Sequence, residues 1–130
     1  MLRIYIAVIL LGLMVVDATE GRDSIVTYRQ MLKSNAASVS KIQLGMTKEE
    51  VQKTMGTFSA KLHDEVIPNP WRVDEFVRDG ETYEVLYYLV VEHPPFAPLL
   101  YYQATPIVLK NGVVVGIGSA ALSTLRPQRE

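Results

Sequence analysis

Few side chains in this sequence are of the types that catalyse reactions or bind metals. Its two histidines are His63, followed by Asp64 and Glu65, and His93, which lies between Glu92 and two prolines. A histidine beside two carboxylates suggests a metal site or an acid–base pair. However, neighbouring loop side chains diverge, and no second histidine stands three or four residues away to complete a ligand set. We therefore expect solvated loops at both positions.

The remaining chemical classes are limited by what the composition lacks. Ser119 and Ser123 have no histidine near them in the sequence to act as a base. The absence of cysteine excludes disulfides, thiol catalysis and cysteine metal sites. Gly112, Gly116 and Gly118 fall in an extended stretch and are not expected to open a helix, so they predict no phosphate-binding loop. We therefore expect no catalytic residues, no cofactor and no metal, and a protein that is not an enzyme.

The charge balance narrows the range of partners. The formal net charge is −1 over 130 residues. Nucleic-acid binding requires clustered lysines and arginines, and anionic membranes attract polybasic segments. Because neither pattern is present, we expect no nucleic-acid partner, whereas membrane association through the N-terminal segment is left open.

The aromatic and apolar residues are more informative. Residues 85–91 read Val-Leu-Tyr-Tyr-Leu-Val-Val, so a strand here is apolar on both faces. Helices on one side leave the other face to be covered, either by the segment around residues 99–102 and the C-terminal segment, or by a partner. Tyrosine suits such an interface because it combines apolar area with a polar tip. The candidate partner-binding residues are Tyr83, Tyr87, Tyr88, Leu99, Leu100, Tyr101 and Tyr102.

Two helices are predicted in the first half of the chain. Apolar residues recur at three- and four-residue steps between Ile25 and Val39, which predicts a helix over about 23–40. Gly45 can end this helix and turn the chain. Thr47 and Glu50 have the spacing of a capping box, which predicts a short helix that Gly56 ends. A DNA-reading helix-turn-helix is the functional alternative, but the neutral charge argues against it.

Strands are predicted in the second half. We expect a loop over 57–70, because Pro68 and Pro70 force extended or turn geometry on the residues before them. The dipeptides Asp79-Gly80 and Asn111-Gly112 each predict a two-residue hairpin. In the first hairpin Arg78 faces Glu81 and Phe76 faces Tyr83, whereas Glu75 faces Glu84 unfavourably, which suggests a bulge or an exposed edge.

These elements predict an α+β domain, in which two N-terminal helices pack on one face of a three- to four-stranded antiparallel sheet. Before it, residues 1–18 have the three parts of a secretory signal: a positive start at Arg3, an apolar run from Ile4 to Val16, and a small residue at Ala18. The run is shorter than the roughly 20 residues that span a bilayer. We expect cleavage after Ala18, with an uncleaved anchor or a buried first helix as alternatives. Residues 19–125 then form one domain and 126–130 a polar tail.

The order of these motifs resembles a known family. A leader is followed by a helix that runs into residues 42–51, Ile-Gln-Leu-Gly-Met-Thr-Lys-Glu-Glu-Val, closed by Met55-Gly56; a hairpin beginning Thr105-Pro106 comes near the end. This pattern is similar to the SmpA/OmlA (BamE-like) family of small bacterial envelope proteins. It is closest to an uncharacterised lipoprotein group that shares residues 83–88. The chain departs from the pattern by lacking the lipidated cysteine and the proline that often follows the Met-Gly turn.

The resemblance implies a BamE-like fold, which also serves as a β-lactamase-inhibitor-protein-like module, and a binding or scaffolding role at the cell envelope. We therefore expect an exported protein, periplasmic or envelope-associated and not lipidated through cysteine, that binds another envelope protein or a second copy of itself. The alternative is a secreted inhibitor or ligand-binding module, which needs a concave sheet lined by aromatic residues such as Trp71 and Tyr101. A hydrolase whose site forms only in three dimensions is the third hypothesis.

Overall fold

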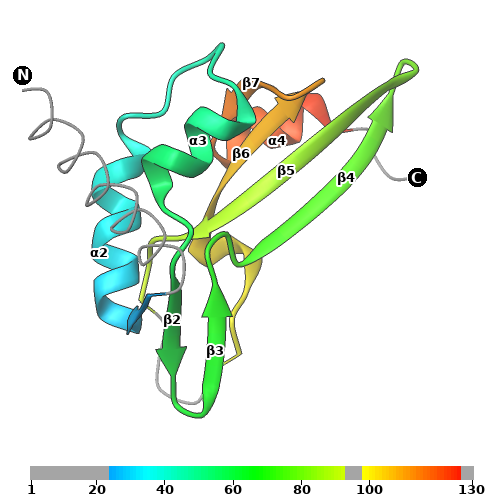
Figure 1. The fold of residues 1–130 in the computed structure, drawn as a ribbon. Helices are drawn as coiled ribbons and strands as arrows, with labels where there is room; N and C mark the ends of the chain where they lie inside the picture. The colour runs from blue at the N-terminus through cyan, green and yellow to red at the C-terminus, as the bar shows by residue number, and fades with distance from the viewer. Residues whose placement is uncertain (1–23, 93–97, 127–130) are drawn as a thin grey trace, which may run out of the picture.

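The computed structural model describes residues 24–92 and 98–126, so the predictions for the leader, His93 and residues 127–130 lie outside the described residues. Two sheets and three helices are seen in the described part (Figure 1). The elements are β1 Ile25–Thr27, α2 Tyr28–Val39, α3 Lys48–Met55, β2 Ser59–Leu62, β3 Glu65–Pro68, β4 Arg72–Arg78, β5 Glu81–Leu89, the 3₁₀ turn η1 Tyr101–Gln103, β6 Ala104–Lys110, β7 Val113–Ile117 and α4 Ser119–Leu125. None of the helices among these residues has the length and apolar character needed to cross a membrane.

The predicted arrangement of two helices on one face of a single antiparallel sheet is wrong. A small sheet of order β1-β2-β3 stands beside a four-stranded antiparallel sheet of order β4-β5-β6-β7. Strand β1 pairs with β2 in parallel, so the small sheet is mixed. Helix α2 contacts the small sheet, α3 packs on one face of the large sheet, and α4 packs on its other face (Figure 1).

Two segments account for this difference. Residues 57–70, expected as a loop, contain the β2–β3 hairpin, which closes at a tight turn where His63 has a φ of 57°. Residues 119–125, expected as part of no element, form α4, and Gly118 is its N-cap, so the expectation that this glycine opens no helix is also wrong. Strands β2 and β3 and helix α4 are each shorter than eight residues, which is too short to show a clear apolar period.

Both predicted helices are present, but α2 ends at Val39 with Ser40 as its C-cap, so the expectation that Gly45 ends it is wrong. Helix α2 begins at Tyr28 rather than near residue 23, because Thr27 caps it through a reciprocal capping box with Gln30. The predicted capping box of α3 is confirmed: the Glu50 amide donates to Thr47 Oγ1 at 3.1 Å, and the Thr47 amide donates to Glu50 Oε1 at 2.9 Å. Gly56 ends α3 with a φ of 89°, a backbone angle that glycine adopts without steric cost.

Both predicted hairpins are confirmed, including the register of the first. Arg78 faces Glu81, Phe76 faces Tyr83 and Glu75 faces Glu84. The like-charged pair is relieved from outside the hairpin, because Lys48 Nζ of α3 lies 2.9 Å from Glu84 Oε2. A bulge occurs instead in the second hairpin, between Val108 and Leu109 of β6 where it pairs with β7.

A buried amide pair joins the two sheets. The Asn35 side chain of α2 donates to Asn69 Oδ1 and to the Leu89 carbonyl, each at 2.9 Å. The Asn69 amide donates in return to Asn35 Oδ1 at 3.1 Å and to the Gly56 carbonyl at 3.1 Å. These bonds satisfy buried polar groups at the end of α3, in α2 and at the end of β5. The pair therefore fixes how the small sheet sits against the large one.

Candidate functional site: the tyrosine pocket

An open pocket of about 460 Å³ lies on the α4 face of the large sheet. Strands β4, β5 and β6 supply its floor, and η1 and α4 supply its walls. We call it the tyrosine pocket. Its lining residues are Asp74, Tyr87, Tyr101, Tyr102, Pro106, Ser119, Leu122 and Arg126. This volume lies within the range of about 300–1,000 Å³ that is usual for ligand pockets.

A charged pair and a phenol meet on the floor of the pocket. Arg126, just after α4, places its Nη2 atom 3.5 Å from Asp74 Oδ2 of β4. The Tyr87 phenol lies close enough to both side chains for them to affect its pKa. Burial raises the pKa of Tyr87 above its ordinary value; Arg126 opposes this shift and Asp74 adds to it. The floor therefore presents hydrogen-bonding groups whose charges largely cancel.

The walls of the pocket are aromatic. The ring of Tyr101 meets that of Tyr87 edge-on at a centroid distance of 4.7 Å and that of Trp71 at 5.1 Å. These contacts fix the first turn of η1 on the sheet, since aromatic pairs prefer edge-to-face geometry. Tyr101 and Tyr102 remain 48% and 74% exposed, respectively. Two tyrosine side chains thus stand at the rim while a third is held in the floor.

Three of the seven candidate residues, Tyr87, Tyr101 and Tyr102, come together at this pocket. Leu100 is exposed beside them, and Leu99 lines a separate hollow of about 500 Å³ next to Trp71. The other two are buried. Tyr83 stacks on Phe76 at 4.9 Å, and Tyr88 is fully enclosed on the opposite face of the sheet. Neither Tyr83 nor Tyr88 can meet a partner while the domain stays folded.

Sequence reasoning missed the polar part of the pocket. Asp74 is one of several charged residues in β4, and Arg126 was assigned to the polar tail. The one available signal is alternation, because Arg72, Asp74, Phe76 and Arg78 share a face in the predicted hairpin register. Ser119 also lines the pocket, through a helix that was not predicted. The contact between Arg126 and Asp74 joins positions 52 residues apart and left no local pattern.

The other residues considered for chemistry lie elsewhere. His63 and Asp64 are exposed in the turn of the β2–β3 hairpin, and Glu65 is exposed at the start of β3. In the described part of the chain no three histidine or acidic side chains gather as metal ligands would. Among the described residues, no histidine lines the tyrosine pocket beside Ser119.

A scan against protein-family models, a search of curated proteins and a search of solved structures each found no match to this chain. The resemblance to the SmpA/OmlA family therefore stays a prediction based on sequence motifs alone.

Proposed function

We propose that this protein is an exported, non-catalytic module of the cell envelope that binds another protein through the tyrosine pocket. One observation carries the proposal: Tyr101 and Tyr102 stay 48% and 74% exposed at the rim of a pocket whose floor holds oriented donors and acceptors. Tyrosine and arginine are the residue types that most often anchor protein interfaces. The leader-like residues 1–18 support an envelope location.

The geometry favours recognition of a side chain or short segment over contact with a flat surface. The rings of Tyr101 and Tyr102, at the rim of the pocket, offer apolar area at a low cost in conformational entropy, because each side chain has few rotatable bonds. The Asp74–Arg126 pair offers directional hydrogen bonds at the bottom. Because these charges largely cancel, a partner group without net charge fits the floor best.

Site-specific photocrosslinking tests this proposal. A photoreactive phenylalanine would replace Tyr102 in one variant and Val66 in a matched control, which is an exposed apolar residue on the small sheet. The proposal predicts one covalent adduct with a protein of the envelope fraction from position 102 and none from position 66. Adding Tyr101→Ala should abolish that adduct. Equal labelling from both positions, or an adduct insensitive to Tyr101→Ala, would count against it.

A ligand-binding or inhibitor role is the second candidate, and the pocket volume is the observation that favours it. A small ligand would enter the pocket without covering its rim, whereas a protein would also cover Leu100 and Tyr102. Surface labelling of these two residues separates the roles. If the second candidate is right, adding a small-molecule extract of the envelope should shift the NMR signals of the Tyr87 ring. Leu100 should stay accessible to the surface label.

A further inference from the structure

Strand β4 forms one edge of the large sheet. Within residues 24–92 and 98–126, β5 is its one paired neighbour. The tip of the β4–β5 hairpin projects beyond β6, which pairs with β5 only as far as Tyr83 (Figure 1). The β4 valines Val73 and Val77 are 50% and 62% exposed. An edge strand without proline presents backbone groups with which another strand can pair, and the four charged side chains of β4 restrict which strand that can be.

The turn at the hairpin tip fixes which backbone groups face outward. Asp79 and Gly80 both have positive φ, 53° and 78°, as a two-residue hairpin turn requires. The pair that flanks such a turn exchanges both of its hydrogen bonds, and hydrogen-bonded pairs then alternate along the hairpin. Arg78 and every second residue before it therefore bond to β5. The N–H and C=O groups of Val73, Glu75 and Val77 point outward.

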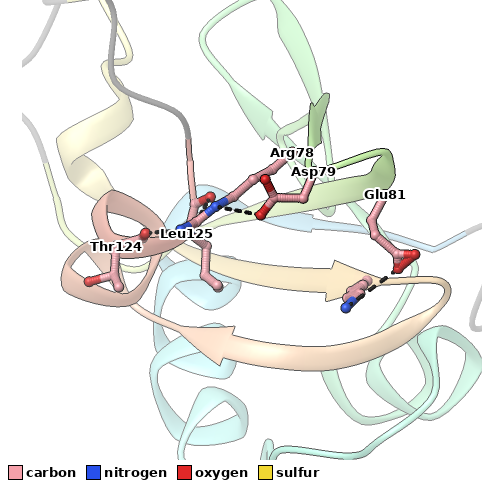
Figure 2. A network of polar contacts seen from close by, with 6 residues as sticks. Arg78, Asp79, Glu81, Thr124 and Leu125 are labelled. Atoms are coloured by element: carbon pink, nitrogen blue, oxygen red, sulfur yellow. Dashed lines mark hydrogen bonds and ion pairs between the residues drawn. The ribbon is translucent and has the colours of Figure 1, made fainter.

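The tip is held rigidly to the body of the domain. Arg78 Nη1 donates to the carbonyls of Thr124 and Leu125 at the end of α4, each at 2.8 Å. The Nε atom of the same side chain lies 3.7 Å from Asp79 Oδ2. Figure 2 shows Arg78 pointing from the hairpin toward the end of α4. The outer edge of β4 is thus ordered before any partner arrives, which reduces the entropy cost of pairing.

We propose that this edge pairs with β4 of a second copy of the chain, antiparallel and about a two-fold axis, so that the two large sheets become one. Outward-facing residues must lie opposite one another in such a pair. Side-chain charge then selects among the few registers that remain.

Three of these registers place like charges opposite each other. With Glu75 facing Glu75 of the second copy, two carboxylates extend the row that Glu75 and Glu84 already form. The register centred on Asp74 sets Asp74 opposite Asp74 of the second copy. The register centred on Val77 sets Glu75 opposite Asp79. Like charges directly opposite on neighbouring strands are destabilising.

Two registers are complementary. The one centred on Val73 sets Arg72 opposite Asp74 but overlaps only residues 72–74 of β4, so the longer one, which overlaps residues 74–78, is favoured. In this longer register Phe76 faces Phe76 on the two-fold axis, Asp74 faces Arg78 twice, and Glu75 faces Val77 twice. The side chains of Asp74 and Arg78 are 33% and 40% exposed, so both keep surface available despite their contacts within the chain. This match of the strand with itself is the reason for assigning the edge to a second copy.

Cysteine crosslinking tests both the pairing and its register, because the chain has no native cysteine. Glu75→Cys and Val77→Cys would be made with tags of different mass and mixed under mild oxidation. Facing residues in a hydrogen-bonded pair have Cα atoms about 5.5 Å apart, within disulfide range. The proposal predicts that the mixed disulfide dimer forms at least about tenfold faster than a dimer of either variant with itself.

Val66→Cys, an exposed valine on the edge strand β3, is the matched control for random collision. Rates for the mixed pair no higher than those of this control would refute the pairing. Faster self-dimerisation of Glu75→Cys or of Val77→Cys would refute the register.

Sedimentation of variants without cysteine gives an independent measurement. The unmodified chain should show a dimer fraction that rises with protein concentration. Glu75→Pro, which removes an outward N–H while leaving the bonds to β5, should remain monomeric. Val66→Pro should dimerise as the unmodified chain does, with circular dichroism to confirm folding. An unmodified chain that stays monomeric, or a foreign strand that pairs with β4 while copies do not, would overturn the proposal.

Discussion

Tyr87 and Tyr88 are neighbours on β5, yet their side chains enter opposite faces of the large sheet. Tyr88 lies on the α3 face, is fully buried, and its hydroxyl has no hydrogen-bond partner among the described residues. Tyr87 lies on the α4 face, where it lines an open pocket together with Asp74 and Arg126. The same residue type thus serves as core on one face and as part of a polar site on the other.

The two faces differ in what covers them. The α3 face is closed by Val51 and Met55 of α3, both about as buried as a side chain can be. No residue of α4 is fully buried, and α4 leaves part of its face to the tyrosine pocket. We infer that α3 contributes more to stability than α4 does, and that the part of the α4 face that α4 leaves uncovered is available for binding.

Equivalent leucine deletions should cost unequal amounts of stability. Leu86→Ala opens a cavity on the α3 face, where the side chain is 1% exposed, and should lower the free energy of unfolding by about 3 kcal/mol. Leu122→Ala on the partly exposed α4 should lower it by about 1 kcal/mol. Urea unfolding at neutral pH measures both values. Equal losses would show that α4 contributes to the core as much as α3 does.

Crowding the α4 face should detach its helix without affecting the α3 face. A Cβ atom on Gly116 would lie 3.0 Å from both Ala121 Cβ and Leu125 Cδ1. Gly116→Val should therefore lift α4 and cost about 2 kcal/mol, because overpacking forces neighbouring segments to move. Amide hydrogen exchange should quicken in α4 and stay unchanged in α3. Faster exchange in both helices would mean that the two faces are not independent.

Sequence patterns predicted the elements that depend on short-range chemistry. The capping box at Thr47 and Glu50 and the turns at Asp79-Gly80 and Asn111-Gly112 each occupy four residues or fewer, so a local pattern is sufficient. The same patterns missed β1, β2, β3 and α4, which have three to seven residues each. Those elements are specified by tertiary contacts, such as the bonds of Asn69 to Asn35 and Gly56.

The candidate site was predicted in part for the same reason. The aromatic residues of the pocket stand out in the sequence because β5 lacks polar alternation between Val85 and Leu89. Alternation along the strand places Tyr87 and Tyr88 on opposite faces of the sheet. Which of the two faces is open depends on where α4 lies. Since α4 was not predicted, Tyr88 and Tyr87 could not be told apart.

Removing the unpartnered hydroxyl should sharpen the contrast between the two tyrosines. Tyr88→Phe should raise the free energy of unfolding by about 1 kcal/mol, since a buried polar group without a partner costs stability. Tyr87→Phe should not raise it in this way, because the Tyr87 hydroxyl is not a buried polar atom that lacks a partner. Thermal unfolding at neutral pH compares the two. A loss of stability in Tyr88→Phe would indicate that its hydroxyl does have a partner.

The same variant should change the response to alkaline pH. Burial raises the pKa of Tyr88 well above its ordinary value of 10.0. Above that pH the unfolded chain loses the phenolic proton while the folded chain keeps it, so stability falls by up to about 1.4 kcal/mol per pH unit. Below it this group makes no pH-dependent contribution. Tyr88→Phe should flatten the decline above pH 10.0, leaving the smaller part due to Tyr87 and Tyr28, whose pKa values burial also raises.

The smallest effect on stability is expected at the charged pair on the floor of the tyrosine pocket. Arg126→Gln removes a partly exposed ion pair with Asp74 and a cation 5.4 Å from the Phe76 ring, and should cost less than about 1 kcal/mol. Because Arg126 lowers the pKa of Tyr87, its loss should move alkaline ionisation of that phenol to higher pH. Tyrosinate absorbance measures this shift.

Arg29→Gln breaks the exposed Arg29–Glu92 pair away from the pocket and is the matched control. If Arg126→Gln weakens the photocrosslink at position 102 while the control keeps it, the charged floor acts in binding and not in folding. Equal crosslinking in both variants would confine recognition to the tyrosine rim.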